Sequence, residues 1–262
     1  MSRGHHTGTI KHILYCNCGG ERMDKYIMAA VDQHLQKVPV KVTIISDLCG
    51  VVAKRKDLLT DLFSSEEEYM VIGCYKRTMD LLLRQTGLQS KASDHINLLE
   101  EPTGEAINKI SGCCENMSGN PLHTEIIENS LWPSWYPVID YDRCTACGQC
   151  ASFCLFGVYE NTGKEIRVVN PEGCKNNCPA CARICPSTAI IFPKYKNGGA
   201  IGGSLDIDEQ AEQQRLAKDI DDLLGNDIYA ALERRKAKRQ SLIREEAMKK
   251  AFNERDKALD EK

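Results

Sequence analysis

The sequence has no long hydrophobic run, no excess of charge of one sign and few aromatic residues. No apolar run approaches the roughly 18–20 residues that a membrane-spanning helix needs, so we expect no membrane span. The formal net charge of the 262 residues is −3, and so balanced a chain lacks the basic character typical of nucleic-acid binding. Aromatic residues make up 6% of the chain, but apolar residues as a whole make up 42%, which is enough for a hydrophobic core.

The usual catalytic and cofactor-binding motifs are also absent from the sequence. It has no nucleophile elbow, Walker loop or HExxH motif, and its six histidines are scattered. No strand–GxGxxG–helix pattern is present, so neither flavin nor nicotinamide is expected as a cofactor. The run GGAIGG at 198–203 follows no clear strand and precedes a charged segment, and we interpret it as a linker. The N-terminal segment MSRGHHTGTIKHILY lacks the long apolar region of a secretory signal, so a cytoplasmic location is expected.

Cysteine, by contrast, is abundant, with fourteen residues in the chain. In a reducing compartment disulfides are rare, and many cysteines there usually mean that the protein binds metal. Eight of the fourteen lie in two similar stretches, VIDYDRCTACGQCASFCLFGVYE from Val138 and VVNPEGCKNNCPACARICPSTAIIF from Val168. Each stretch contains a short apolar strand, a turn, four cysteines and a second apolar strand. This internal repeat predicts a small pseudo-symmetric domain.

The spacing of these cysteines identifies the expected metal group. The first stretch reads C-x2-C-x2-C-x3-C and the second C-x3-C-x2-C-x3-C-P, which resembles the bacterial ferredoxins with two [4Fe–4S] clusters. In that family three closely spaced thiolates hold one cluster, and the fourth thiolate reaches the other cluster. The resemblance implies a first cluster held by Cys144, Cys147, Cys150 and Cys185. It implies a second cluster held by Cys174, Cys178, Cys181 and Cys154.

Two departures from the family pattern concern the second cluster. Three residues rather than two separate Cys174 from Cys178, and Leu155 rather than proline follows Cys154. Neither departure removes a ligand, but both can alter the hydrogen bonding to the sulfurs and so the reduction potential. Structural zinc is the alternative, but a zinc site normally separates its two C-x2-C pairs by about a dozen residues or more. Because metal binding is coupled to folding in such small domains, we predict that residues 138–192 do not fold without iron and sulfide.

The N-terminal residues 1–115 show a different pattern, in which predicted strands alternate with predicted helices. The strand candidates are IKHILY, KVTIIS, EYMVIGC and HINLLEE. The helix candidates are DKYIMAAVDQHLQKV, KRKDLLTDLF, KRTMDLLLRQTGL and PTGEAINKISG. This alternation predicts an α/β domain with a parallel sheet, which looks flavodoxin- or Rossmann-like. The predicted fold class is therefore this α/β domain (1–115), a linker (116–137), an α+β ferredoxin-like dicluster domain (138–197) and a helical charged tail (198–262).

Four of the remaining cysteines follow the predicted strands. Two lie after the first strand, and one lies after each of the next two, at Cys16, Cys18, Cys49 and Cys74. Because the carboxyl ends of parallel strands meet at one edge of a sheet, a strand order of 2-1-3 would bring these thiols together. We therefore predict a third metal site there, most simply a [4Fe–4S] cluster. Gly19 and Gly20 would let the backbone pass close to the cluster.

The same segment resembles the N-terminal region of heterodisulfide reductase A-type subunits. The shared features are C-x-C-G-G after the first strand, a cysteine after the second, and CYKRTMDLLLRQTGL, a cysteine followed by a basic helix. Those proteins are large and contain flavin as well as ferredoxin modules, whereas this chain lacks the flavin fingerprint. Zinc binding, thiol redox chemistry and simple packing of buried cysteines remain alternatives for the four thiols. Cys113 and Cys114 are candidate auxiliary ligands, or else two thiols in a loop.

Two further segments concern packing and partners. Trp132 and Trp135 precede the dicluster segment, where we expect them to pack the two domains together, with a partner-binding face as the alternative. In the charged tail, apolar residues recur at helical spacing, at Ile220, Leu223, Leu224, Ile228, Ala231 and Leu232. This pattern indicates either a solvated tail or an arm that folds on a partner subunit.

These features together predict an iron–sulfur electron-transfer protein. We expect it to be a subunit of a larger anaerobic oxidoreductase and to pass low-potential single electrons through two or three [4Fe–4S] clusters. We assign no catalytic residue, and we do not expect the chain to be an enzyme on its own. The alternative is a heterodisulfide-reductase-like subunit whose N-terminal thiols carry out thiol/disulfide or substrate redox chemistry. A third hypothesis is a scaffold whose α/β domain binds a partner without metal.

Overall fold

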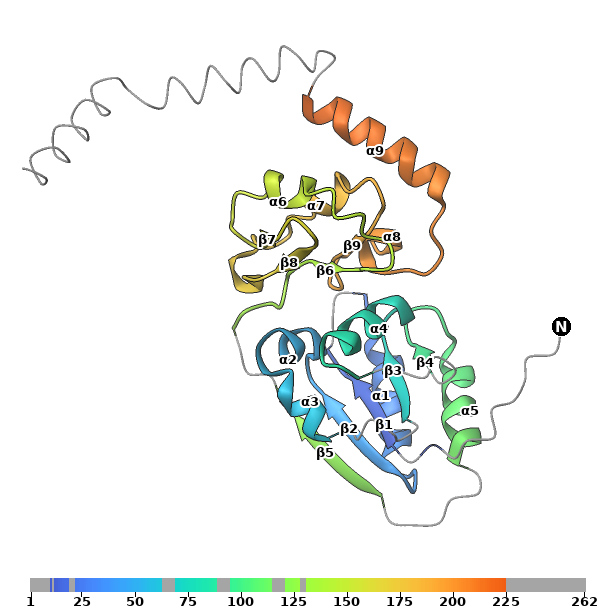
Figure 1. Cartoon of the computed structure of the whole chain (residues 1–262). Coiled ribbons are helices and arrows are strands. Elements are labelled where there is room, and N and C mark those ends of the chain that lie inside the picture. The colour runs from blue at the N-terminus through green and yellow to red at the C-terminus, as the bar shows by residue number, and fades with distance from the viewer. Residues whose placement is uncertain are drawn as a thin grey trace, which may run out of the picture. The chain divides into compact units, whose positions relative to one another are not determined.

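The computed structural model of the chain describes residues 10, 12–18, 22–62, 69–88, 95–114, 121–127 and 131–224. The two glycines after Cys18 and the tail beyond residue 224 lie outside these residues, so the expectations for both stay untested. The chain divides into two compact units, residues 1–212 and 213–262. Every element before the last helix belongs to the first unit (Figure 1).

The first unit contains a five-stranded parallel sheet with the strand order β4-β3-β1-β2-β5. Its strands are β1 (His12–Cys16), β2 (Lys41–Ile45), β3 (Tyr69–Gly73), β4 (His95–Asn97) and β5 (Leu122–Ile126). The predicted α/β class is confirmed, and β1 lies between β2 and β3 as the 2-1-3 order requires. Every residue of β1 and of β3 is buried, because helices cover both faces of the sheet.

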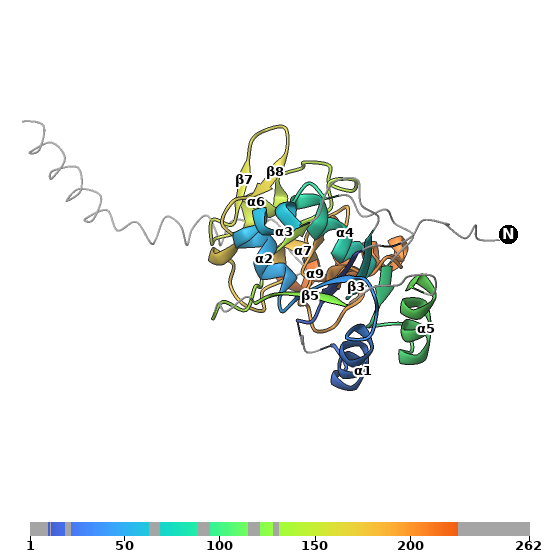
Figure 2. The same cartoon turned by 90° about the horizontal axis from the view of Figure 1, so that it is seen from below.

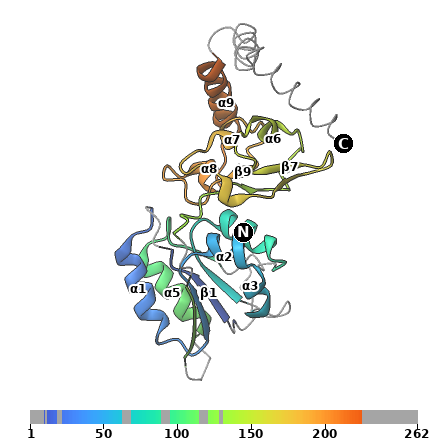
Figure 3. The ribbon, with the colours of Figure 1, turned by 90° about the vertical axis from the view of Figure 1, so that its left-hand side faces the viewer.

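Five helices cover this sheet, two on one face and three on the other. They are α1 (Lys25–Leu35), α2 (Leu48–Arg55), α3 (Asp57–Leu62), α4 (Lys76–Gln85) and α5 (Thr103–Cys114). Figure 3 shows β1 with α1 and α5 on one side and α2 and α3 on the other, and Figure 2 shows the same division from below. Two hydrophobic clusters match these faces, one below α1 and α5 and one below α2 and α4.

The fifth strand differs from the sequence-based expectation. Residues 122–126 were expected to belong to a linker, but they form β5 and pair in parallel with β2. The strand reads LHTEI, and of its residues only Ile126 is buried. An edge strand of this kind carries too little apolar periodicity to be recognised from the sequence.

The dicluster segment forms small antiparallel strand pairs and short helices. Strand β6 (Val138–Ile139) pairs with β9 (Ile190–Ile191), and β7 (Tyr159–Asn161) pairs with β8 (Ile166–Val168). The other elements are α6 (Gln149–Phe153), the 3-10 helix η1 (Pro171–Gly173), α7 (Ala180–Arg183), α8 (Gly199–Gly202) and α9 (Glu209–Leu224). None of the helices within the described part of the chain is long and apolar enough to cross a membrane.

The repeat seen in the sequence is retained in the backbone of this segment. Ala146 and Asn177, each just before the second cysteine of its stretch, have φ values of 54° and 59°. Gly157 and Thr188, each three residues after the fourth cysteine, have φ values of 65° and 50°. Left-handed backbone at matching positions means that both cysteine loops turn in the same way. The extra residue of the second stretch therefore lies before Asn177.

The run GGAIGG also differs from the linker that we expected. Residues 199–202 form α8, and Ala200, Ile201 and Gly202 are buried. The carbonyl of Gly202 accepts a hydrogen bond of 3.2 Å from Oγ1 of Thr78 in α4. Gly203 has a φ of 98°, and a Cβ built on it would lie 1.9 Å from Oγ1 of Thr78. The glycines therefore let this turn pack tightly against the α/β domain.

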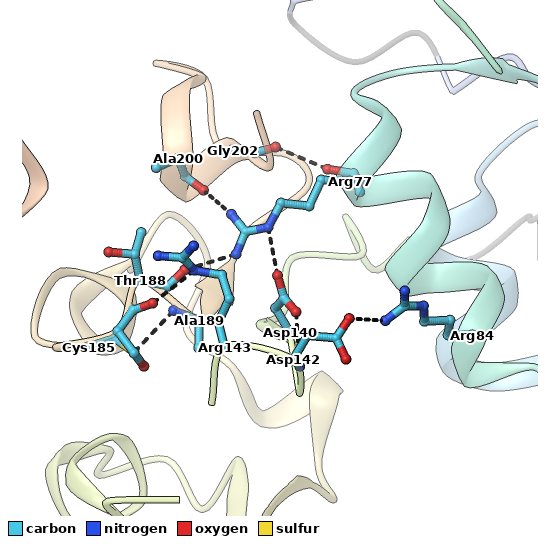
Figure 4. A network of polar contacts seen from close by, with 12 residues as sticks. Arg77, Arg84, Asp140, Asp142, Arg143, Cys185, Thr188, Ala189, Ala200 and Gly202 are labelled. Carbon is cyan, nitrogen blue, oxygen red and sulfur yellow. Dashed lines mark hydrogen bonds and ion pairs between the residues drawn. The ribbon is translucent and has the colours of Figure 1, made fainter. Parts of the chain in front are cut away.

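A buried charge network joins the same two regions (Figure 4). Arg77 of α4 is 5% exposed, and its Nε donates a hydrogen bond of 2.9 Å to Oδ2 of Asp140. Its two terminal nitrogens donate to the carbonyls of Thr188 (2.9 Å) and Ala200 (3.3 Å). The guanidinium of one domain thus binds one carboxylate and two backbone carbonyls of the other. Arg84, on the same helix, makes an exposed ion pair with Asp142 at 2.6 Å.

Both tryptophans pack within the chain. The ring of Trp135 stacks on Phe192 with centroids 5.0 Å apart, inside the core of the dicluster domain. Trp132 stacks on Tyr136 at 5.6 Å and packs against the hydrophobic cluster of the α/β domain. Trp135 thus packs on the dicluster domain and Trp132 on the α/β domain, so the segment that carries them contacts both domains.

Candidate metal centres

The structure brings the first set of predicted ligands together around one small cavity. Its wall contains the three thiols of the first loop and the distant fourth thiol, namely Cys144, Cys147, Cys150 and Cys185. Burial raises the pKa of the Cys150 thiol to about 11, and the charges of the other three thiols act in the same direction. These four sulfurs are therefore electrostatic neighbours in the fold, although they are up to 41 positions apart in the sequence.

The second set is also gathered, by the loop before α7 and the end of α6. Burial raises the pKa of Cys174 to about 12, with the neighbouring thiols of Cys178 and Cys154 adding to the shift. The pKa of Cys181 is raised to about 12, again mainly by burial, and the thiols of Cys174 and Cys154 contribute. The cross-over of the fourth thiol that the ferredoxin resemblance implies is thus compatible with the observed arrangement.

Hydrogen bonds reach sulfurs in both of these sets. The backbone N–H of Ala189 donates to Sγ of Cys185 at 3.3 Å (Figure 4), and the hydroxyl of Tyr159 donates to Sγ of Cys181 at 3.0 Å. Burial raises the pKa of Tyr159, so its hydroxyl keeps the proton that it donates. Hydrogen bonds to the sulfurs are one of the main influences on the potential of an iron–sulfur cluster.

The four N-terminal thiols line a single cavity of about 360 Å³ at the carboxyl edge of the sheet. Strand β1 ends at Cys16, the first turn of α2 carries Cys49, and Cys74 directly follows β3. Cys18, two residues beyond the end of β1, completes the set. The predicted convergence of four thiols from three strands is confirmed by this arrangement.

The size of this cavity fits a group larger than a single ion. A cavity needs only roughly 10–15 Å³ to hold one water molecule, so this space is much larger than a single water or ion requires. Zinc requires four sulfurs at about 2.3 Å from one point. A cubane instead binds each thiolate at a different iron, which matches thiols spread around a cavity.

The electrostatics of the cavity disfavour a reactive thiol. The hydrogen bond that the Cys16 thiol donates to Cys18, together with burial, raises the pKa of Cys16 well above its ordinary value. Burial also raises the pKa of Cys49, and that of Cys74 to about 12. Redox-active cysteines need a lowered pKa, because the thiolate is the nucleophile. Positive iron atoms would instead displace the protons when the thiols bind them.

Other walls of the cavity are polar and positively charged. Arg22, Lys194 and Lys196 line it together with the thiols. The guanidinium of Arg22 lies 4.8 Å from the ring centroid of Tyr75 and donates a hydrogen bond of 3.0 Å to the carbonyl of Pro193. Three cations beside four thiols suit an anionic group, such as a thiolate-ligated cluster. Nothing in the cysteine spacing had pointed to these cations, because they lie outside the motifs.

The dicluster domain supplies part of the cavity wall. Asn176 and Asn177, from the widened loop between Cys174 and Cys178, line the cavity. Cys174 packs against the hydrophobic cluster that contains Cys16 and Cys49. The thiol cavity therefore lies directly beside the loop that carries the second set of predicted ligands. The extra residue of this loop was the only sequence signal for this contact.

Cys113 and Cys114 lie elsewhere, at the end of α5. Their sulfurs are 3.3 Å apart, and Sγ of Cys113 donates to the carbonyl of Ile110 at 2.9 Å. Cys114 belongs to the hydrophobic cluster below α1 and α5, on the opposite face of the sheet from α2 and α4, and Cys113 packs against this cluster. Neither lines the thiol cavity.

The fold and the gathered cysteines define an α/β domain joined to a ferredoxin-type dicluster domain. Residues 136–217 match the family model of the 4Fe–4S dicluster domain. Through this segment the chain belongs to the family of ferredoxins with two [4Fe–4S] clusters. The α/β domain precedes the matched residues. No solved structure matches the chain.

Three relatives support this assignment. An uncharacterized ferredoxin of Methanocaldococcus jannaschii is 48% identical over 64 residues, which are 24% of this chain and 44% of that protein. Ferredoxin-3 of Nostoc is 30% identical over 87 residues, covering 26% of this chain and 89% of that protein. The pyruvate synthase subunit PorD of Methanothermobacter marburgensis is 29% identical over 76 residues, covering 29% of this chain and 88% of the subunit. The chain thus spans less than half the length of the first relative.

Proposed function

We propose that the chain is an electron-transfer protein with three [4Fe–4S] clusters, two in the dicluster domain and a third in the thiol cavity. In this proposal Cys144, Cys147, Cys150 and Cys185 hold the first cluster, and Cys174, Cys178, Cys181 and Cys154 hold the second. The third is held by Cys16, Cys18, Cys49 and Cys74. The observation that carries the proposal is that these last four thiols line one cavity beside the loop of the second set.

The residues around the cavity have distinct roles in this proposal. The four thiolates bind iron, and Arg22, Lys194 and Lys196 offset the negative charge of the bound group. Apolar side chains such as Leu48 and Trp135 limit the access of water. A cubane with four protein ligands gains and loses single electrons, and its coordination sphere has no position for a substrate. This favours electron transfer over chemistry on a substrate.

The alternative, a heterodisulfide-reductase-like subunit with thiol/disulfide chemistry at the cavity, has weaker support. It requires a reactive thiolate or an open coordination position. Burial raises the pKa of Cys49 and Cys74, which is unfavourable for a nucleophile at neutral pH. The resemblance to such subunits remains compatible with a cluster that only transfers electrons.

The partner is proposed to be a larger oxidoreductase in the cytoplasm of an anaerobic organism. Two relatives are named ferredoxins, and a third is named a subunit of pyruvate synthase. Attachment to the partner is assigned to the charged segment from α9 onward, most of which lies outside the described residues. The low potential typical of ferredoxin cubanes, on the order of −400 mV, suits such metabolism.

A reductive titration of protein purified without oxygen tests this function. With a low-potential donor, three clusters take up about three electrons per chain, and two clusters take up about two. Replacing both Cys16 and Cys18 by serine is expected to lower the uptake from about three electrons to about two. The matched control replaces Cys113 and Cys114 by serine and is expected to leave the uptake unchanged. Uptake of two electrons by the unmodified chain would overturn the third cluster.

A further inference from the structure

Lys194 is the cation most directly connected to the thiol cavity. It follows β9 in the dicluster domain, and its Nζ lies 2.6 Å from Oδ2 of Asp47 in the α/β domain. Both side chains are largely buried, with 23% and 15% of their surface exposed. Asp47 caps α2 by accepting a hydrogen bond of 3.2 Å from the N–H of Gly50, and it stands two residues before Cys49. The ion pair therefore joins the two domains at the wall of the cavity.

The charges around Lys194 act together with those of the thiols. Burial alone lowers the pKa of Lys194, but the charges of Cys49 and Asp47 more than offset this and raise it. Cys18 contributes in the same direction. The ammonium group thus interacts favourably with negative charge on at least two of the proposed ligands. Arg22, the other cation with defined contacts, is held by the ring of Tyr75 and the carbonyl of Pro193.

We infer that Lys194 raises the reduction potential of the cavity cluster and that Asp47 lowers it, so that the ion pair sets the potential. This inference rests on the proposed third cluster. Reduction adds one negative charge to the cluster, which a nearby cation favours and a nearby carboxylate opposes. The α/β domain supplies the thiols, while the dicluster domain supplies the cation. The potential of the third cluster therefore depends on the contact between the two domains.

The expected size of the effect follows from Coulomb's law. At an effective dielectric constant of about 20, a unit charge roughly 12 Å from the cluster changes the ratio of reduced to oxidised cluster about tenfold, and a closer charge changes it more. Lys194 and the thiols line one cavity of about 360 Å³, so we expect an effect of this order. For a one-electron couple a tenfold change corresponds to about 59 mV.

A redox titration of the full chain, followed by electron paramagnetic resonance, tests the inference. Lys194→Gln is expected to lower the reduced-to-oxidised ratio of the cavity cluster about tenfold at a fixed potential. Asp47→Asn, which can still cap α2, is expected to raise the ratio, and the double variant is expected to return close to the unmodified chain. The matched control is Arg84→Gln, which removes the exposed interdomain pair with Asp142 and leaves the cavity cluster unchanged.

The outcomes separate this inference from the proposed function. If the unmodified chain binds only about eight iron atoms, the third cluster itself is refuted. If it binds about twelve and Lys194→Gln shifts the cavity cluster no more than Arg84→Gln does, only the role of Lys194 is refuted. If the Lys194→Gln variant does not bind the third cluster, two other variants, Asp47→Asn and Lys194→Arg, test the inference instead. Asp47→Asn must then raise the ratio of reduced to oxidised cavity cluster, and Lys194→Arg must leave this ratio unchanged. Any other result overturns the inference.

Discussion

The buried pair of Arg77 and Asp140 makes a prediction that can be worked out in detail. The perturbation is Arg77→Met, which keeps an unbranched apolar side chain but removes the charge and the hydrogen-bond donors. Asp140 is 7% exposed, so it would be left as a buried carboxylate without its cation. The carbonyls of Thr188 and Ala200 would also lose the hydrogen bonds of 2.9 Å and 3.3 Å that Arg77 donates. Removing one partner of a buried pair costs about 3–5 kcal/mol.

The matched control for this variant changes Arg84, which lies on the same helix, α4. Arg84 also joins α4 to the dicluster domain, but the side chains of Arg84 and Asp142 are 55% and 72% exposed. Exposed pairs contribute about 0–1 kcal/mol, so Arg84→Gln is expected to have little effect. The double variant Arg77→Met/Asp140→Asn is expected to recover much of the loss, because it leaves no unpaired buried charge.

Hydrogen exchange of the anaerobic, cluster-loaded protein measures the cost. A loss of about 3 kcal/mol speeds exchange through opening of the interface more than a hundredfold, since 1.4 kcal/mol is a factor of ten. The acceleration is expected in peptides from α4 and from the turn after β6. If Arg77→Met and Arg84→Gln accelerate exchange by the same small factor, the buried pair does not hold the two domains together.

Three further predictions concern pH, packing and potential. Burial lowers the pKa of His12 to about 4, so its stabilising contribution is complete above about pH 6.5 and is lost as the pH falls towards 4. Between pH 7 and 5 the unfolding free energy should fall by about 2 kcal/mol more in the unmodified chain than in His12→Gln. Gly203→Ala should destabilise the fold by about 1–3 kcal/mol, because its Cβ would meet a threonine oxygen of α4 at 1.9 Å. Gly199→Ala, with positive φ but no neighbour within 4 Å, is its control in thermal melting, and equal losses would refute the clash. Tyr159→Phe removes the hydrogen bond of 3.0 Å to Cys181 and should lower the potential of the second cluster alone, as measured by redox titration.

The sequence predicts the parts of the fold that depend on strong periodicity. Strands β1 and β3 are fully buried apolar runs, and their regular alternation with helices implied the parallel sheet. Cysteines at or shortly after the ends of β1, β2 and β3 were expected to meet at one edge of the sheet, and all four line one cavity there. Strand β5 was missed because an exposed edge strand needs no apolar pattern.

Other features depend on tertiary contacts that leave no local signal. The GGAIGG run looks like a linker, because glycine-rich segments are usually flexible, but here the missing side chains permit close packing against Thr78. Lys194 and Arg22 lie outside every cysteine motif, and only the folded chain brings them to the thiols. The assignment of individual cysteines to individual clusters stays a prediction from the ferredoxin resemblance.

The most direct test of the account is the content of iron and acid-labile sulfide per chain in protein purified without oxygen. The account predicts about twelve atoms of each, four for every cluster. A content of about eight of each would contradict it, because the dicluster domain alone would then bind all of the iron. The cavity lined by Cys16, Cys18, Cys49 and Cys74 would in that case have another purpose.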